Sequence, residues 1–221
     1  MKPYLMQELS PELDGSLGSN RSEQPCFLGA KTDQQALLAW LGQYLGNANT
    51  LSAYRKEAER LGLWALLCLR KPISSLTAED FEAYAGFLLN PSPRELWQSP
   101  AGGRKGRKDP DWRPFQGPLS PQAQRQALII LNSCMAWLVS ARYLAGNPLS
   151  LSRRPRQRTS LKVERYLERP LWDYLKEYVE GLAQESDRDR AHAQRLRWVL
   201  SLFYLGGLRI SDIVDNGMSA F

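Results

Sequence analysis

The chain has 221 residues, of which 43% are hydrophobic and 24% charged, a balance typical of folded globular proteins that excludes wholesale disorder. The apolar runs are too short for a membrane span, the first residues lack the apolar core of a signal peptide, and the three cysteines lie far apart. We therefore expect a cytoplasmic protein without disulfides and without a membrane partner. The net charge of +6 is unevenly distributed, because residues 91–165 carry 14 Lys and Arg against 4 Asp and Glu. Such a segment predicts a polyanionic partner, with nucleic acid as the first candidate.

The single histidine, His192, argues against a metal site, and we expect neither a metal nor another cofactor. Residues 1–30 are rich in Ser, Gly, Pro and Glu without a sustained period, which predicts a flexible N-terminal tail. Residues 31–148 then show apolar residues at helical spacing, and we expect an all-α domain of four helices. These helices are expected from Thr32 to Gly46, from about Asn49 to Leu69, from Thr77 to Asn90, and from Ser120 to Leu144.

Residues 91–118 interrupt this pattern with a segment rich in Gly, Pro and basic residues, which we interpret as a long loop or insertion. A second basic segment, residues 149–165, is expected to be an interdomain linker. Beyond it, residues 166–221 form a second unit with helices predicted at about 170–184 and 188–205. The apolar stripes of these two helices predict exposed apolar surface, because little sequence remains to cover them.

Residues 205–213, with the sequence LGGLRISDI, resemble the first catalytic box of the tyrosine recombinases, the phage integrase family. The glycine pair lets the chain leave a helix through a turn that other residues resist. Leu208 and Ile210 are expected to anchor this turn in a core, and Ser211 to cap the short helix that follows. Arg209 would then be held rigidly, as suits a guanidinium that grips a phosphate.

Two weaker features have the order found in this family. Thr50 to Arg55 resembles the start of its DNA-contacting helix, and Asn147-Pro148 resembles the pair that closes its core-binding domain. The resemblance implies a four-helix, SAM-like core-binding domain followed by the first helices of a catalytic domain. It also implies DNA integration and recombination through a phosphotyrosine intermediate, with double-stranded DNA and full-length recombinase protomers as partners.

Of the family's catalytic residues, only the first arginine is matched, by Arg209. The residues after it include no Tyr, Lys, His or Arg, and the tyrosines at 166, 174, 178 and 204 precede it. A lone arginine stabilises charge on a phosphate but supplies neither nucleophile nor acid. We therefore expect a truncated, catalytically incomplete recombinase, so whether the chain is an enzyme stays open. The alternatives are a non-catalytic DNA-binding or regulatory protein that competes for recombination sites, and a helical protein-interaction module.

The candidate DNA contacts are basic residues at helix starts, in the insertion and in the linker; the alternatives are an ordinary exposed helix face, a disordered insertion and a solvated flexible linker. Tyr54 lies on an apolar stripe and is expected in the core. The basic candidates are Arg55, Arg104, Lys105, Arg107, Lys108, Arg125, Arg153, Arg154, Arg156 and Arg158.

Overall fold

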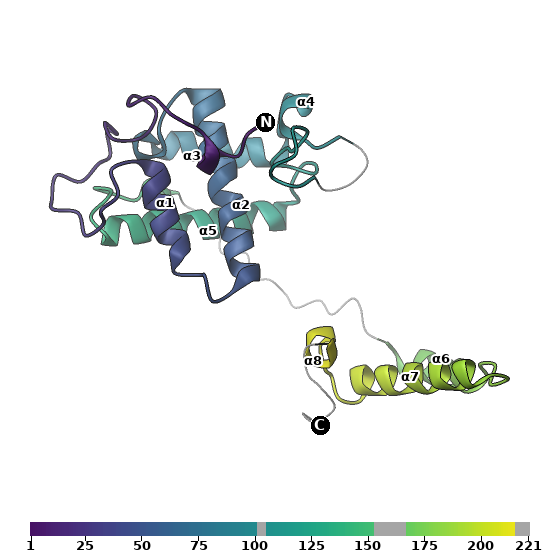
Figure 1. The fold of residues 1–221 in the computed structure, drawn as a ribbon. Helices are drawn as coiled ribbons and strands as arrows, with labels where there is room; N and C mark the ends of the chain where they lie inside the picture. Colours follow the sequence, from purple (N-terminus) through teal and green to yellow (C-terminus); the bar gives the residue numbers. More distant parts are fainter. Residues whose placement is uncertain (101–104, 153–166, 215–221) are drawn as a thin grey trace. The chain divides into compact units, whose positions relative to one another are not determined.

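The computed structural model describes residues 1–100, 105–152 and 167–214, and the chain divides into two compact units, residues 1–155 and 156–221 (Figure 1). The described residues form helices, turns and two isolated β-bridges but no strand, which confirms the all-α prediction. None of the helices in these ranges has the length and apolar character required to cross a membrane.

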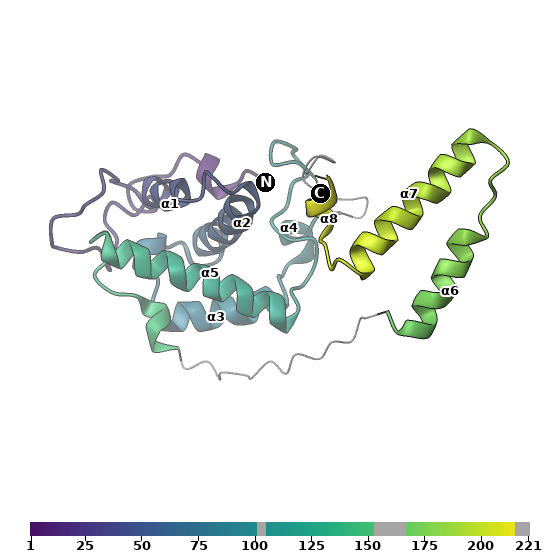
Figure 2. The same cartoon turned by 90° about the horizontal axis from the view of Figure 1, so that it is seen from below.

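Unit 1 contains four helices of ten or more residues and one short helix. They are α1 (Asp33–Gly42), α2 (Ala48–Trp64), α3 (Ala78–Leu89), α4 (Arg94–Trp97) and α5 (Pro121–Ser140). Helix α5 packs against α1, α2 and α3, and α1 also packs against α2. Figures 1 and 2 show α5 crossing the α1–α2 pair, with the core between these helices.

Local capping signals set most of the helix starts. Thr32 and Thr77 each form a capping box, and Ser120 caps α5 ahead of a proline in its first turn, so these three helices begin where the sequence predicts. The helix α2 begins slightly earlier than expected, because the side chain of Asn47 accepts a hydrogen bond from the Thr50 N–H at 3.0 Å. A π-helical turn, Ala65–Leu69, continues α2 to its predicted end.

Two helices end earlier than the sequence suggests, for reasons of local conformation. Helix α1 stops at Gly42 and passes into turns that reach Gly46. Helix α5 stops at Ser140, because Arg142 adopts a left-handed conformation with φ of 57°. This turn brings Tyr143, which follows it, into the core.

The expectation of a flexible tail over residues 1–30 is wrong, because this segment packs on the helices. A 3-10 turn at Tyr4–Met6 places the ring of Tyr4, which is 1% exposed, against α2. A Cβ atom added to Gly62 would lie 2.4 Å from that ring, so only glycine admits the close approach. Further along, the Asn20 N–H donates to the Ser74 carbonyl at 2.8 Å.

A buried carboxylate joins these parts of unit 1. Asp33, at the start of α1, is 1% exposed, and its two oxygens accept hydrogen bonds from the Ser74 N–H and the Tyr143 hydroxyl, both at 2.9 Å. Its own N–H donates to the Asp14 carbonyl at 2.7 Å. Burial raises the pKa of Asp33, while the bonds from Ser74 and Tyr143 act in the opposite direction.

The described parts of the 91–118 segment, residues 91–100 and 105–118, form little regular structure, as expected of a loop, but their aromatic side chains pack into the core. Trp97, Trp112 and Phe115 are all buried. The Phe115 N–H also donates a hydrogen bond to the Trp97 carbonyl at 3.1 Å. Phe87 of α3 packs edge to face on Trp97, with ring centroids 4.9 Å apart. Aromatic side chains thus fix a segment whose backbone forms little regular structure.

Unit 1 also includes the first residues of the predicted linker. Asn147 caps a 3-10 turn at Pro148–Leu151, accepting from the Leu149 N–H at 3.0 Å, and Leu149 is buried. The rest of that linker, residues 153–165, lies outside the described residues.

Unit 2 is a helical hairpin of α6 (Arg169–Glu180) and α7 (Asp187–Tyr204), followed by the short α8 (Ile210–Val214). Trp172 stacks on Tyr204 with ring centroids 4.1 Å apart. Among residues 167–214, buried apolar side chains are few, and Trp198 is 63% exposed. Apolar surface is therefore exposed on this hairpin, as its sequence predicts.

We expect Asp33→Ala to destabilise unit 1 by about 2–5 kcal/mol, because the buried Ser74 N–H and Tyr143 hydroxyl would both lose their acceptor. Urea unfolding followed by tryptophan fluorescence measures this, since five of the seven tryptophans lie in unit 1. Tyr143→Phe removes one of these bonds and should cost about 1 kcal/mol. If the Asp33→Ala variant unfolded with its midpoint at the same urea concentration as the wild-type protein, Asp33 would not hold these segments together.

Candidate nucleic-acid interface

The structure divides the predicted DNA contacts into three groups. Arg104 and the four linker arginines, Arg153, Arg154, Arg156 and Arg158, lie outside the described residues. Lys108 and Arg125 are exposed, and Lys105 is half-buried. Arg55 and Arg107 are instead half-buried close to a buried glutamate, Glu59.

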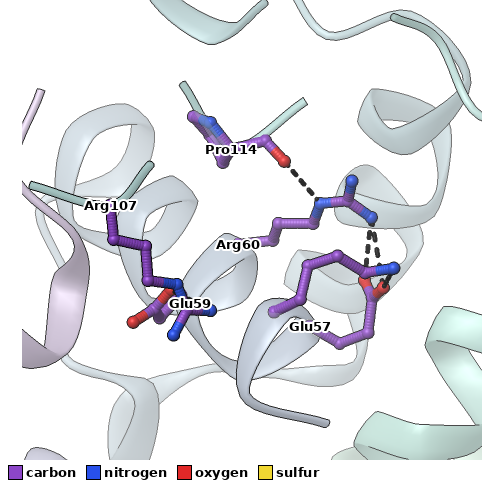
Figure 3. A network of polar contacts seen from close by, with 6 residues as sticks. Glu57, Glu59, Arg60, Arg107 and Pro114 are labelled. Atoms are coloured by element: carbon purple, nitrogen blue, oxygen red, sulfur yellow. Dashed lines mark hydrogen bonds and ion pairs between the residues drawn. The ribbon is translucent and has the colours of Figure 1, made fainter. Parts of the chain in front are cut away.

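Three charged residues of α2 are buried near the described part of the 91–118 segment. These residues are Glu57, Glu59 and Arg60. The Arg60 Nη1 donates to both oxygens of Glu57, at 3.1 and 3.2 Å, and its Nε donates to the Pro114 carbonyl at 2.9 Å (Figure 3). The same guanidinium lies 4.4 Å from the centroid of the Phe115 ring. Arg60 therefore holds the segment on α2 while its charge is balanced by Glu57.

Glu59 forms a second link between α2 and the segment. One of its oxygens lies 2.9 Å from Nη2 of Arg107 (Figure 3). Burial raises the pKa of Glu59 to about 6, although Arg107 and Arg55 both act to lower it. The expectation that Arg107 is simply a DNA contact is thus incomplete, because its guanidinium already pairs with a buried carboxylate.

Between α2 and the segment lies a basic pocket of about 480 Å³. Five of the side chains that line it are cationic: Lys56, Arg60, Lys105, Arg107 and Arg113. No acidic side chain of the described residues lines it, although Lys56 pairs with Glu57 at 3.3 Å. Sequence reasoning missed Lys56, Arg60 and Arg113. Lys56 and Arg60 lie on α2, and only the packing of Trp112 and Phe115 brings Arg113 and its segment onto that helix.

Arg113 is held by main-chain oxygens rather than by a carboxylate. Its guanidinium donates to the carbonyls of Glu95, Pro110 and Trp112 at distances between 2.9 and 3.2 Å. In the described parts of the chain it forms no ion pair, and Lys105 forms neither an ion pair nor a hydrogen bond. Among the described residues, no direct partner therefore neutralises the positive charge of these two side chains.

The residues that carry the family resemblance lie at the end of α7 in unit 2. Gly207 has φ of +60°, and a Cβ atom at Gly206 would lie 2.7 Å from the Leu202 carbonyl oxygen, so the turn needs both glycines, as predicted. Arg209 follows it and is exposed. Its backbone N–H donates to Oδ2 of Asp212 at 2.8 Å.

Two details of this turn differ from the sequence expectation. Helix α8 begins at Ile210, so Ser211 lies within it and Asp212 provides the side-chain hydrogen bond at its start. Ile210 is 71% exposed, so it does not anchor the turn in a core.

Tyr54 is half-buried and stacks on Trp40, with ring centroids 5.3 Å apart, in agreement with the prediction that it belongs to the core. The described residues contain no group of His, Cys, Asp and Glu side chains that could hold a metal ion. No protein-family model, curated protein or solved structure matches the chain.

We expect Glu59→Gln to stabilise unit 1 at pH 7 and to leave it unchanged below about pH 4.5. A carboxyl whose pKa is raised on folding binds its proton more tightly in the folded protein, so stability falls as pH rises from about 4.5 to 6. Glutamine has no charge to desolvate, and the gain at pH 7 should approach 2 kcal/mol. Urea unfolding at the two pH values measures it. A less stable variant at pH 7 would mean that the pair with Arg107 outweighs the burial of Glu59.

Proposed function

We propose that the chain binds double-stranded DNA through unit 1 and the adjoining basic residues, as the DNA-binding portion of a site-specific tyrosine recombinase. The observation that carries the DNA-binding part is the concentration of positive charge in residues 91–165, with a net charge of +10. Among the described cations of this segment, Lys105, Lys108 and Arg125 are exposed or half-exposed. Cations arranged in this way attract phosphates and release counterions from DNA, largely independently of base sequence.

The recombinase part of the proposal rests on residues 205–213. The left-handed Gly207 and the exposed Arg209 are compatible with an arginine presented from a tight turn to a phosphate. In such a reaction Arg209 would stabilise charge on the attacked phosphodiester, while a tyrosine hydroxyl would be the nucleophile. In this view unit 1 is a SAM-like core-binding domain, and full-length protomers of such an enzyme are further partners.

A non-catalytic DNA-binding protein is the second candidate function. It is favoured by the position of the positive charge, which is concentrated in residues 91–165 and does not depend on Arg209. A protein of this kind would occupy recombination sites and compete with an active enzyme for them.

We expect the chain to bind duplex DNA of unrelated sequences with affinities that fall steeply with salt. With about four phosphate contacts, affinity should drop on the order of a hundredfold between 50 and 200 mM salt. Fluorescence anisotropy of a labelled duplex measures this. Arg125→Gln combined with Lys108→Gln should weaken binding and reduce the salt slope, whereas Lys31→Gln combined with Lys176→Gln, which also removes two positive charges, serves as the control. Absence of salt-sensitive binding would contradict both DNA-binding functions and favour a protein-interaction module.

A suicide DNA substrate, which traps a covalent phosphotyrosine, distinguishes an enzyme from a binder. We expect no covalent adduct from this chain on a denaturing gel, because no tyrosine follows Arg209. A trapped adduct would show that one of the upstream tyrosines is a nucleophile, and its mapping by mass spectrometry would identify which.

A further inference from the structure

We propose that the basic pocket between α2 and the 91–118 segment is a binding site for a phosphate group, and that Glu59 competes with this group for Arg107. The phosphate belongs either to the backbone of DNA, in which case the inference rests on the proposed function, or to a free phosphate compound. Both sources offer the same chemistry to the pocket.

The charge balance of the pocket favours an anion. Glu57 neutralises Arg60 and lies near Lys56, and Glu59 neutralises Arg107. Of the five cationic side chains in the lining, this leaves Lys105 and Arg113, and neither forms an ion pair within the described residues. Asp109 and Asp111 belong to the same segment but do not line the pocket. The pocket therefore has an excess of positive charge that a phosphate dianion or diester would neutralise.

The walls of the pocket strengthen this attraction. Trp112 and Pro114, both buried, form part of its lining, and Arg60 and Arg113 are fixed by hydrogen bonds to main-chain carbonyls. Cations held in place beside apolar side chains lose less conformational entropy on binding than free surface lysines and are less screened by water. A volume of about 480 Å³ also admits a phosphate together with the groups attached to it.

Arg107 connects the pocket to a buried carboxylate. Its guanidinium lines the pocket while one nitrogen lies 2.9 Å from Glu59. A phosphate that recruits this guanidinium must compete with Glu59, so the carboxylate lowers the affinity of the pocket. Removing the charge of Glu59 should then strengthen phosphate binding, because Arg107 is released and a nearby negative charge is lost.

Isothermal titration of the full chain with inorganic pyrophosphate at low salt tests the site. We expect Lys105→Gln to weaken binding roughly tenfold, since a charge-assisted contact is lost, and the double variant with Lys56→Gln to weaken it further. Lys31→Gln, at an exposed position of unit 1 outside the pocket lining, is the matched control and should change the affinity less than twofold. Glu59→Gln should tighten binding several-fold. Circular dichroism and urea unfolding check that each variant is folded.

The same variants are then titrated with a labelled DNA duplex. Parallel losses of pyrophosphate and DNA affinity would support the pocket and identify its phosphate as that of DNA. A loss confined to pyrophosphate would support the pocket and assign it to a free phosphate compound. Salt-sensitive DNA binding with no pyrophosphate binding, or with pyrophosphate binding that Lys105→Gln and Lys56→Gln leave unchanged, would overturn the pocket while the proposed function stands. Pyrophosphate binding that these variants weaken, without any DNA binding, would support the pocket and contradict the proposed function.

Discussion

The buried carboxylate of Asp33 is the constraint around which unit 1 is organised. A carboxylate removed from water is unfavourable unless donors surround it, and here the donors come from residues distant in sequence, Ser74 and Tyr143. The backbone of Asp33 also reaches Asp14 in the first segment. The start of α1, the turn before α3 and the end of α5 are therefore held at one point. The left-handed Arg142 and the early end of α5 follow from the need to bring Tyr143 there.

The helices could be predicted from the sequence because their signals are local. Thr32, Thr77 and Ser120 lie within three residues of the N–H groups that they cap, so spacing alone identifies them. The packing of residues 1–30 and 91–118 could not be predicted in this way. Their contacts, such as Tyr4 over Gly62, join positions far apart, and Gly- and Pro-rich composition indicates only that the backbone is irregular. The tryptophans at 97 and 112 were the available signal that the second segment is packed.

The candidate interface was predictable only in part, for the same reason. Lys105 and Lys108 were identified by their local charge, and the turn at Gly207 by its glycine pair. Lys56 and Arg113 became candidates only when the fold brought their segments together. Arg107 illustrates the limit of composition, because a basic residue in a basic segment pairs with a buried glutamate. Charge density predicts the kind of partner, while tertiary contacts decide which cations are available to it.

The pairing of Glu57 with Arg60 has a consequence for the order in which unit 1 assembles. The two residues are three positions apart on α2, with 3.1 Å between their polar atoms, so their charges neutralise each other once that helix forms. Contacts of short sequence separation form before those that close long loops. The 91–118 segment thus docks onto a helix on which the charge of Arg60 is already balanced, whereas Glu59 meets Arg107 only when the segment is in place. Phe115 and the Pro114 carbonyl then complete the surroundings of Arg60, and we expect these long-range contacts to form after the helix.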